Sequence, residues 1–402
     1  MRRPLAEREG FVLMAVIFSI AIMSLVVVVA FTTSDDERRS ARASRESTLA
    51  LYAADAGLGA TLGNWPTAAT AALTPGDSVD LGWITIPNGG KYRPIIHRVD
   101  SGGVQHYSIM VHGQRANSYG GQATLVSMVA GASRFKSAVT AHGPITMSGS
   151  SAGIVDAYDS DAAPYSALSG ATATIVSNGS ISLSNSFTVR GDVTSASTTS
   201  NTSGVTGTVK SFAQPFTASP IIPCPTTGYT PGVPITSTKM RYSALTGVLE
   251  LDSYAGNLTL SGSNKYYFSR VIIYGGSSIT IDGGGQPVDV VVNDILGFGP
   301  GGIINPTEKP TRLSFSSCGS PATPQKWYVA GGTFAHYSVY APNHAIDVSG
   351  GGAAATNNIY GALVGASILI PSATRLHYDA ALTRVPGNTM TVVPGTWAQL
   401  PR

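Results

Sequence analysis

Cysteine is scarce in this chain. Among 402 residues there are two, Cys224 and Cys318. They permit one disulfide in an oxidising compartment, and two unpaired buried thiols are the alternative. Neither cysteine has a second Cys or a His at ligand spacing, which argues against a metal site built on them. We therefore expect neither a metal nor a cofactor.

Charge is also sparse, since Asp, Glu, Lys and Arg make up 12% of the residues and the formal net charge is +3. A net charge this small, with the charged residues evenly spread along the chain, does not favour a nucleic-acid partner. The combination of low charge with 43% apolar residues, 46 Gly and 24 Pro favours a folded, β-rich body over a disordered tail.

One apolar run, in contrast, is long. Phe11 to Phe31 is a stretch of 21 residues without a charge, interrupted only by Ser19 and Ser24. As a helix it rises about 30 Å, enough to cross a hydrocarbon core. No convincing Ala-x-Ala cleavage site follows, so we expect a retained membrane span rather than a signal peptide. Arginines flank both ends, which leaves the orientation open.

The helical pattern continues beyond the apolar run, and we predict one helix over 11–64. Ser34 and Glu37 have the form of a capping box, and no Pro or internal Gly occurs before Gly57. Small residues fall on one face at helical spacing: Ala43, Ala50, Ala54 and Gly57. This stripe predicts close packing against another helix, with a plain juxtamembrane stalk as the alternative.

A period-two pattern follows. The runs "KYRPIIHRV", "VQHYSIMVHG" and "GQATLVSMVAG" are separated by turn-forming residues and predict antiparallel hairpins. We expect residues 65–134 to form a small antiparallel sheet against which the long helix packs, which makes a first domain of ordinary size.

Beyond residue 135 a short phrase recurs, consisting of apolar, polar and apolar residues before a turn. It begins at Ile145, Ile181, Leu258, Ile279, Ile346 and Ile368. Two neighbouring pairs are offset by 21 and 22 residues, near one coil of a stacked β-solenoid. We therefore expect residues 135–385 to form an all-β, right-handed β-solenoid-like domain, followed by a C-terminal tail over 386–402. The overall class is α+β, and an irregular β-sandwich is the alternative for the second domain.

Motifs that suggest catalysis lack their structural context. "GSSAG" around Ser151 has no helical pattern after it, and "GFGPGG" at 297–302 is followed by Pro rather than by a phosphate-binding helix. Asp289 and Asp294 have an odd separation that places them on opposite faces of a strand, and Asp282 stands apart. We predict that the protein is not an enzyme.

Two further sets of polar residues are candidate metal ligands. Asp156, Asp159 and Asp161 could bind calcium, although a solvated turn is favoured because the loop glycine and terminal glutamate of a calcium loop are lacking. His336, His344 and His377 form no pair at ligand spacing, and we expect surface or strand residues.

The N-terminal motifs resemble those of a known family. "EREG" followed by "FVLMAVIFS" resembles the class III leader of type IV pilin-like proteins, which would make residues 1–10 a leader cut between Gly10 and Phe11. "ALYAADAGL" at 50–58 is similar to the "AEAGL" signature of PilX-type minor pilins, with Asp55 in place of Glu. "RLHYDAAL" at 375–382 resembles the end of a β-rich domain appended to such pilins.

The resemblance implies a minor pilin-like protein of pilus assembly or of the pilus tip. Its partners would be other pilin subunits, the inner membrane and a prepilin peptidase, with methylation of the new N-terminus. The protein would be a single-pass inner-membrane precursor with an extracytoplasmic domain, and later part of the pilus. Ala15 stands where major pilins carry Glu, which implies a minor subunit.

Surface glycans are a further expected partner, through five aromatic residues at strand spacing: Tyr266, Tyr267, Trp327, Tyr328 and Tyr337. Packing is the alternative role for such rings. Two other functions remain open, namely a membrane-anchored polysaccharide-active β-helix enzyme and a pseudopilin of type II secretion.

Overall fold

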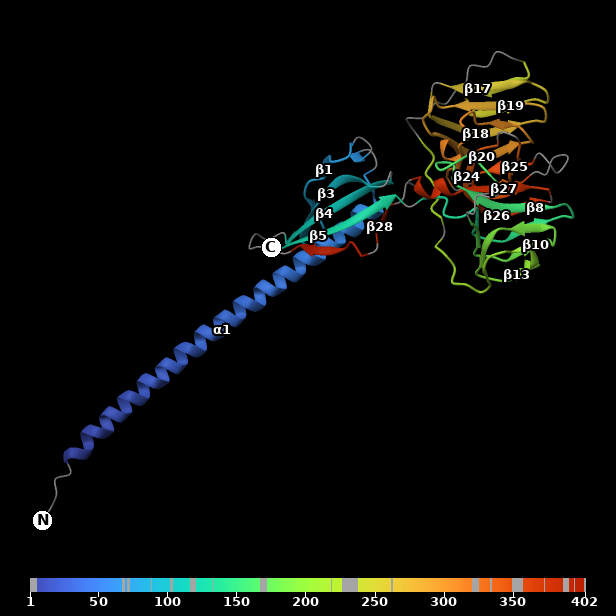
Figure 1. The fold of residues 1–402 in the computed structure, drawn as a ribbon. Coiled ribbons are helices and arrows are strands. Elements are labelled where there is room, and N and C mark those ends of the chain that lie inside the picture. The colour runs from blue at the N-terminus through green and yellow to red at the C-terminus, as the bar shows by residue number, and fades with distance from the viewer. Residues whose placement is uncertain are drawn as a thin grey trace. The chain divides into compact units, whose positions relative to one another are not determined.

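The computed structural model consists of two compact units. Unit 1 comprises Met1–Gly131 with Met390–Arg402, and unit 2 comprises Ala132–Thr389. The structure describes residues 6–66, 69–70, 73–87, 89–101, 104–115, 121–131, 133–166, 172–217, 219–225, 238–261, 263–319, 325–332, 335–348, 357–371, 373–385, 390–393 and 395–400. The first five residues of the expected leader lie outside this set. The chain is α+β, with one long helix and a large β-rich region (Figure 1).

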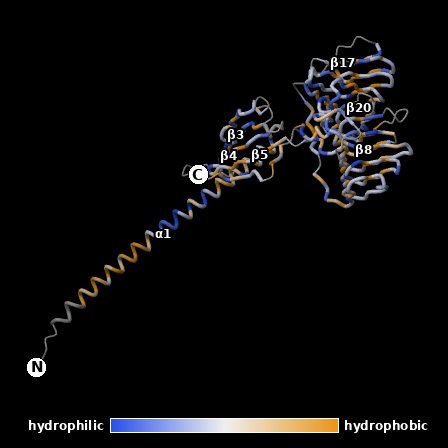
Figure 2. The backbone as a smooth tube through the Cα atoms, viewed as in Figure 1, coloured by the Kyte–Doolittle hydropathy of each residue, from blue (hydrophilic) through white to orange (hydrophobic). Residues whose placement is uncertain are grey.

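The long helix, α1 (Ala6–Gly63), has two dissimilar halves. Its side chains from Val12 to Phe31 are exposed and mostly apolar, and Figure 2 shows them as one continuous hydrophobic stretch. Among the described residues, α1 is the one helix long and apolar enough to cross a membrane. That property makes it compatible with a membrane anchor.

The second half of α1 packs on an antiparallel sheet of order β1-β3-β4-β5-β28, with β2 on β3 and β29 on β5. The strands are β1 (Ser78–Asp80), β2 (Ile84–Thr85), β3 (Gly90–Ser101), β4 (Val104–Arg115), β5 (Gln122–Gly131), β28 (Met390–Val392) and β29 (Ala398–Leu400). The three predicted strand runs are β3, β4 and β5. Residues 390–400, expected within a tail, instead supply two strands to the edge of β5.

The interface between α1 and this sheet depends on small residues. Ala50 and Ala54 are fully buried, and a Cβ on Gly113 of β4 would lie 2.1 Å from the carbonyl oxygen of Ala50. A Cβ on Gly57 would lie 2.5 Å from the ring of Tyr92. The small-residue stripe was expected to meet another helix; in the structure it lets the sheet of the same chain approach the helix backbone.

Unit 2 contains a 15-stranded sheet in the order β14-β12-β9-β6-β26-β24-β22-β20-β18-β16-β15, with β7, β10, β13 and β23 paired beside this path. Its strands are β6 (Val139–Ala141), β7 (Ile145–Ser148), β9 (Ala173–Ser177), β10 (Ile181–Leu183), β12 (Gly191–Ser195), β13 (Thr199–Ser200), β14 (Val209–Lys210), β15 (Met240–Ser243), β16 (Val248–Leu251), β18 (Lys265–Ile273), β20 (Val288–Phe298), β22 (Leu313–Ser317), β23 (Trp327–Val329), β24 (Ser338–Val348) and β26 (Leu363–Pro371).

Two smaller sheets accompany it. One has the order β11-β8-β27-β25 and the other β17-β19-β21. Their strands are β8 (Gly153–Tyr158), β11 (Phe187–Val189), β25 (Asn358–Tyr360), β27 (Arg375–Asp379), β17 (Asn257–Ser261), β19 (Ser278–Asp282) and β21 (Ile303–Ile304). Three 3-10 turns complete the unit: η1 (Thr202–Gly204), η2 (Pro310–Arg312) and η3 (Ala380–Arg384). Among the described residues of unit 2, every strand pairing is parallel except that of β15 with β16.

The recurring phrases lie in register with one another. Ile346 pairs with Ile368, Ile368 with Ile145, and Ile145 with Ile181. Leu258 likewise pairs with Ile279. All six side chains are buried, so each phrase contributes one inward residue to a shared apolar core.

The order of the strands differs from their order along the chain. The last long strand, β26, pairs with β6 and β7, which are the first strands of unit 2. The chain therefore enters the large sheet in its middle, proceeds to the edge at β14, and resumes at the opposite edge at β15 (Figure 1).

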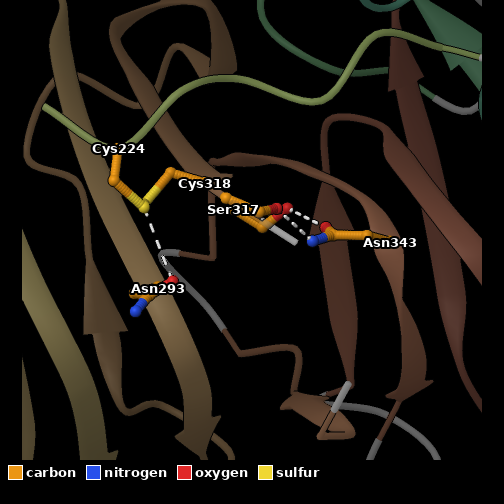
Figure 3. Close-up of a disulfide and its surroundings, with 6 residues drawn as sticks. Cys224, Asn293, Ser317, Cys318 and Asn343 are labelled. Atoms are coloured by element: carbon orange, nitrogen blue, oxygen red, sulfur yellow. Dashed lines mark hydrogen bonds between the residues drawn. A yellow bond between two sulfur atoms is a disulfide. The ribbon is translucent and has the colours of Figure 1, made fainter. Parts of the chain in front are cut away.

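The described parts of the connection between these edges run across successive strands. Phe216 exchanges two hydrogen bonds with Asn178, the amide of Ser219 donates to His142, and the hydroxyl of Tyr340 donates to the carbonyl of Pro220. Cys224 then forms a disulfide with Cys318, directly after β22 (Figure 3). Ser317, beside it, donates to Asn343 at 2.6 Å. The two cysteines are thus paired, and their disulfide attaches the connection to the sheet.

Candidate functional site

A row of polar and aromatic side chains crosses the sheet β11-β8-β27-β25. His336 bridges to Tyr360, Tyr360 pairs with His377, and His377 pairs with Asp156. The neighbours of Asp156 on β8 and of His377 on β27, which are Val155 and Leu376, belong to the apolar core. Because side chains alternate along a strand, the row lies on the opposite face of the sheet, away from that core.

Asp156 is surrounded by three side chains, those of His377, Tyr165 and Arg190. Its Oδ1 lies 2.6 Å from Nδ1 of His377, and its Oδ2 accepts from the hydroxyl of Tyr165 at 2.9 Å. The guanidinium of Arg190 is 3.8 Å from Oδ2. Asp156 and His377 are nearly inaccessible, with relative exposures of 3% and 2%. A carboxylate this deeply buried requires such partners, because an unpaired buried charge is strongly unfavourable.

Aromatic rings pack along the same row. The rings of His336 and Tyr360 are stacked, with their centroids 4.2 Å apart. The ring centroids of Tyr165 and His377 are 3.9 Å apart. Tyr158 meets Tyr165 edge-on at 5.5 Å. These contacts fix the orientations of the rings.

The segment 159–166 covers part of the row and is held at three points. Asp379 accepts from the amide and the hydroxyl of Ser160, at 2.9 and 2.6 Å. Arg384 donates to both Asp159 and Asp161, and Lys309 lies 3.3 Å from Asp161. The segment is therefore tied to η3 and to the turn before η2 by charged hydrogen bonds.

A cleft of about 490 Å³ lies beside this segment. It is lined by the strand residues Tyr158 and Tyr360, by the bridge residue His336 and by two turns. The turn residues are Ser160, Ala162, Ala163, Pro164, Tyr165, Thr307, Glu308 and Lys309. The volume is in the range of small-molecule binding sites, and the mixture of rings and a few polar groups is typical of them.

The electrostatics of the site follow from burial. Burial lowers the pKa of His336 to about 4, with a further contribution from His377, so the imidazole is neutral near pH 7. Burial raises the pKa of Asp379, although hydrogen bonds from Ser160 and Ala381 oppose the shift. Burial also raises the pKa of Tyr158 and of Tyr165, and for Tyr165 the hydrogen bond to Asp156 adds to the effect. Both tyrosines therefore keep their protons.

Asp156 and His377 are engaged with each other and with neighbouring side chains. The nitrogens of His377 are engaged on both sides, by Asp156 at 2.6 Å and by Asn358 at 3.3 Å. Asp156 is covered by Tyr165. Proton transfer to a substrate requires a base within hydrogen-bond reach, which neither residue offers while these bonds hold. Among the described residues, no group of three His, Cys, Asp or Glu side chains is arranged to hold a metal ion.

The predicted residues on α1 differ in their exposure to solvent. Gly10 and Phe11 lie within α1, and Ala15 is exposed on it. Ala50, Ala54 and Gly57 are buried against the sheet, whereas Asp55 is exposed.

The predicted acidic residues are not gathered into one site. Asp156 is hydrogen-bonded to His377, and the carboxylates of Asp159 and Asp161 bind the guanidinium of Arg384, so side chains of the same chain occupy the oxygens considered for calcium. Asp289 accepts from Ser314 and Ser316, and Asp294 pairs with Arg270. Asp282 is exposed at a turn, where it accepts from the amide of Gly284.

The aromatic residues expected to meet glycans are mostly inaccessible. Tyr266, Trp327 and Tyr337 are buried in the core, Tyr267 is half-buried, and Tyr328 is 45% exposed. Tyr266, Trp327 and Tyr337 therefore take the packing alternative. His344 and His377 are buried residues of β24 and β27, which is the strand alternative, and His336 is a buried bridge residue rather than a surface one.

Sequence reasoning missed the cleft itself. Its residues come from 158–165, 307–309, 336 and 360, and no short motif joins them. Two sequence segments could have indicated the cleft. They are "DAYDSD" at 156–161 with the nearby Tyr165, and "HYDAAL" at 377–382, which supplies His377 and Asp379.

Residues 245–385 match the profile of a family described as "Domain of unknown function (DUF7305)". No curated protein and no solved structure matches the chain. The matched region contains His336, Tyr360, His377 and the turn at 307–309, whereas Asp156, Tyr158 and Tyr165 precede it.

Proposed function

We propose that this chain is a minor pilin-like structural protein that takes part in type IV pilus assembly or tip formation. The observation that carries the proposal is the division of α1. Its apolar half is exposed, and its second half is packed on an antiparallel sheet of the same chain. A helix of this kind can place its free half first in a membrane and then in a bundle of similar helices.

The N-terminal motifs supply the route. A prepilin peptidase would cut between Gly10 and Phe11, and the new N-terminus would be methylated. Before cleavage the protein would be a single-pass protein of the inner membrane, with the antiparallel sheet of unit 1 and the whole of unit 2 outside the cytoplasm. Because the same apolar surface is buried in lipid and in the filament, transfer between the two need not expose it to water.

We infer further that unit 2 is a right-handed β-solenoid displayed outside the cell. The parallel pairings and the in-register isoleucines support this architecture. Crossovers between parallel strands of one sheet are nearly always right-handed. The disulfide between Cys224 and Cys318 fits an oxidising compartment outside the cytoplasm.

Mass spectrometry of the N-terminal peptide tests the proposal. We expect a methylated peptide beginning at Phe11 in sheared surface filaments, and intact Met1 when Gly10→Leu blocks the cleavage. Gly59→Ala, at an exposed helical position with open space around it, serves as the control that should be processed normally. An intact N-terminus confined to membranes would contradict the proposal, and a processed protein confined to the envelope would favour a type II secretion pseudopilin.

A further inference from the structure

We propose that the cleft between residues 160–165 and 307–309 binds a neutral carbohydrate. This inference rests on the proposed function insofar as unit 2 must face the cell exterior, and it assigns the partner of the displayed unit. The site differs from the aromatic set singled out in the sequence, since Tyr266, Trp327 and Tyr337 are buried in the core.

The first argument concerns buried polar atoms without partners. The hydroxyl of Tyr158 and Nδ1 of His336 are buried and have no hydrogen-bond partner among the described residues, and both residues line the cleft. Tyr158 is 2% exposed and His336 is 8% exposed. Buried polar groups are nearly always satisfied, so a molecule bound in the cleft can supply the missing bonds to these two atoms, whereas the unpartnered hydroxyl of Tyr266 lies away from the cleft. A ligand rich in hydroxyl groups can donate to the imidazole and accept from, or donate to, the phenol.

The second argument concerns the apolar lining. Ala162, Ala163 and Pro164 lie on one side of the cleft, next to the ring of Tyr165. Sugars combine hydroxyl groups at their edges with apolar C–H faces, and they therefore suit a site that offers both kinds of surface.

The third argument concerns charge. Two of the described lining residues are charged, Glu308 and Lys309, and they have opposite signs. Lys309 also lies 3.3 Å from the carboxylate of Asp161. His336 adds no charge near pH 7 because burial keeps it neutral. The cleft thus has no excess of cations with which to attract an acidic glycan, and a neutral ligand fits best.

The test is binding of a panel of neutral and acidic glycans to the purified full chain in detergent, near pH 7. The informative variant is Tyr158→Phe, which removes only the unpartnered hydroxyl. The matched control is Tyr266→Phe, because the hydroxyl of Tyr266 is also buried without a partner among the described residues but lies outside the cleft. His336→Gln is the second test variant.

We expect binding of glycans with neutral hexoses, weakened about three- to tenfold by Tyr158→Phe and unchanged by Tyr266→Phe. The thermal stability of the ligand-free Tyr158→Phe protein should not fall, which separates a binding role from a structural one. The proposal is overturned if no glycan binds at millimolar concentration, if only acidic glycans bind, or if both Tyr158→Phe and His336→Gln bind as the wild type does. Recovery of Tyr158→Phe in sheared filaments, measured in parallel, shows whether assembly holds independently of binding.

Discussion

At the scale of single residues, Asp156 connects parts of the chain that are far apart in sequence. It pairs with His377, which is 221 residues away, and accepts from Tyr165 in the covering segment. Removing the carboxylate leaves the buried imidazole of His377 and the half-buried hydroxyl of Tyr165 without this partner. Losing one partner of a buried network costs about 3 kcal/mol.

We therefore expect Asp156→Ala to lower the free energy of unfolding of unit 2 by about 3 kcal/mol in urea denaturation. Asp282→Ala is the control, because Asp282 is exposed and accepts a hydrogen bond from the backbone amide of Gly284 in a turn. The control substitution should lower the free energy of unfolding by less than about 1 kcal/mol. Equal losses in the two variants would show that the buried network adds little.

His336 predicts a dependence of stability on pH. Tyr360, His377 and Glu308 face it, and burial lowers its pKa to about 4 from 6.5. Between these values the unfolded chain binds more protons than the folded one, so stability falls as the pH is lowered through this window. The loss contributed by His336 is about 3 kcal/mol.

His336→Gln should remove this contribution. We expect the wild type to lose more unfolding free energy than the variant between pH 7 and pH 4, with the difference developing below about pH 6.5. Urea denaturation at several pH values measures it. Parallel curves for the two proteins would show that the protonation of His336 is not linked to folding.

The residue scale is also where prediction from sequence was weakest. The inward isoleucines could be found because alternation and a turn residue are local signals. The partners of Asp156 could not, because a pair separated by 221 residues has no local pattern. Histidine is polar, which favoured the surface, yet the carboxylate and stacked rings compensate its burial.

At the scale of elements, the contact of α1 with β4 depends on the absence of a side chain. A Cβ at Gly113 would lie 2.1 Å from the carbonyl oxygen of Ala50 and 2.5 Å from the amide nitrogen of Ala54. These are backbone atoms of a helix and cannot move singly. The helix and sheet would have to separate, with loss of packing at Ala50, Ala54 and Leu58.

Gly113→Ala should therefore destabilise unit 1 by about 1–3 kcal/mol or more. Gly59→Ala is the matched control, because nothing lies within 4 Å of a Cβ there and the position is helical. It should be neutral or stabilising, by up to about 1 kcal/mol. Thermal unfolding of both variants measures the contrast, and a tolerated Gly113→Ala would mean that the interface adjusts easily.

The connection between β14 and β15 depends on its covalent attachment. The disulfide joins residues 94 apart in sequence, so it restricts a long segment of the unfolded chain. Loop-closure entropy gives about 4–5 kcal/mol for such a crosslink. Cys224→Ser should lower the unfolding free energy of unit 2 by roughly this amount. A reductant should lower the unfolding free energy of the wild type but not that of the variant. A wild type unaffected by reductant under denaturing conditions would contradict the pairing.

Elements were partly predictable. Strands β3, β4 and β5 follow from alternation, and α1 follows from its composition and length. The strands after Met390 were missed because a short C-terminal segment carries little periodicity, and its pairing partner β5 is more than 250 residues earlier. The small-residue stripe was recognised, but its partner was not, since Ala and Gly permit close approach by either a helix or a sheet.

At the scale of the whole molecule, the last strands of each unit pair with strands that lie far earlier in the chain. In unit 1, β28 and β29 join β5. In unit 2, β26 joins β6 and β7. The period of the repeated phrase could predict that the strands stack, but not the spatial order in which they stack, because similar phrases can pair in any order. Long-range parallel pairing of this kind also makes slow folding expected, because its loop-closure entropy is lost before the contacts form.

Under the proposed pilus function, we expect one residue on the exposed half of α1 to set the position of the molecule within a filament. Ala15 is the fifth residue after the expected cut and cannot offer a carboxylate to the N-terminal amine of a neighbouring subunit. In a bundle of apolar helices an unpaired amine is costly, so a place at the filament end, where fewer subunits depend on that pairing, is favoured.

Ala15→Glu should therefore let the protein enter filaments along their length. We expect a several-fold rise in its amount relative to the major subunit in sheared filaments, and labelling along the shaft rather than at the ends in electron microscopy. Ala15→Gln is the matched control, because it adds similar bulk without the charge and should leave the distribution as in the wild type. Unchanged incorporation of Ala15→Glu, with normal processing at Phe11, would mean that the shape of the two folded units, rather than the missing carboxylate, sets the position.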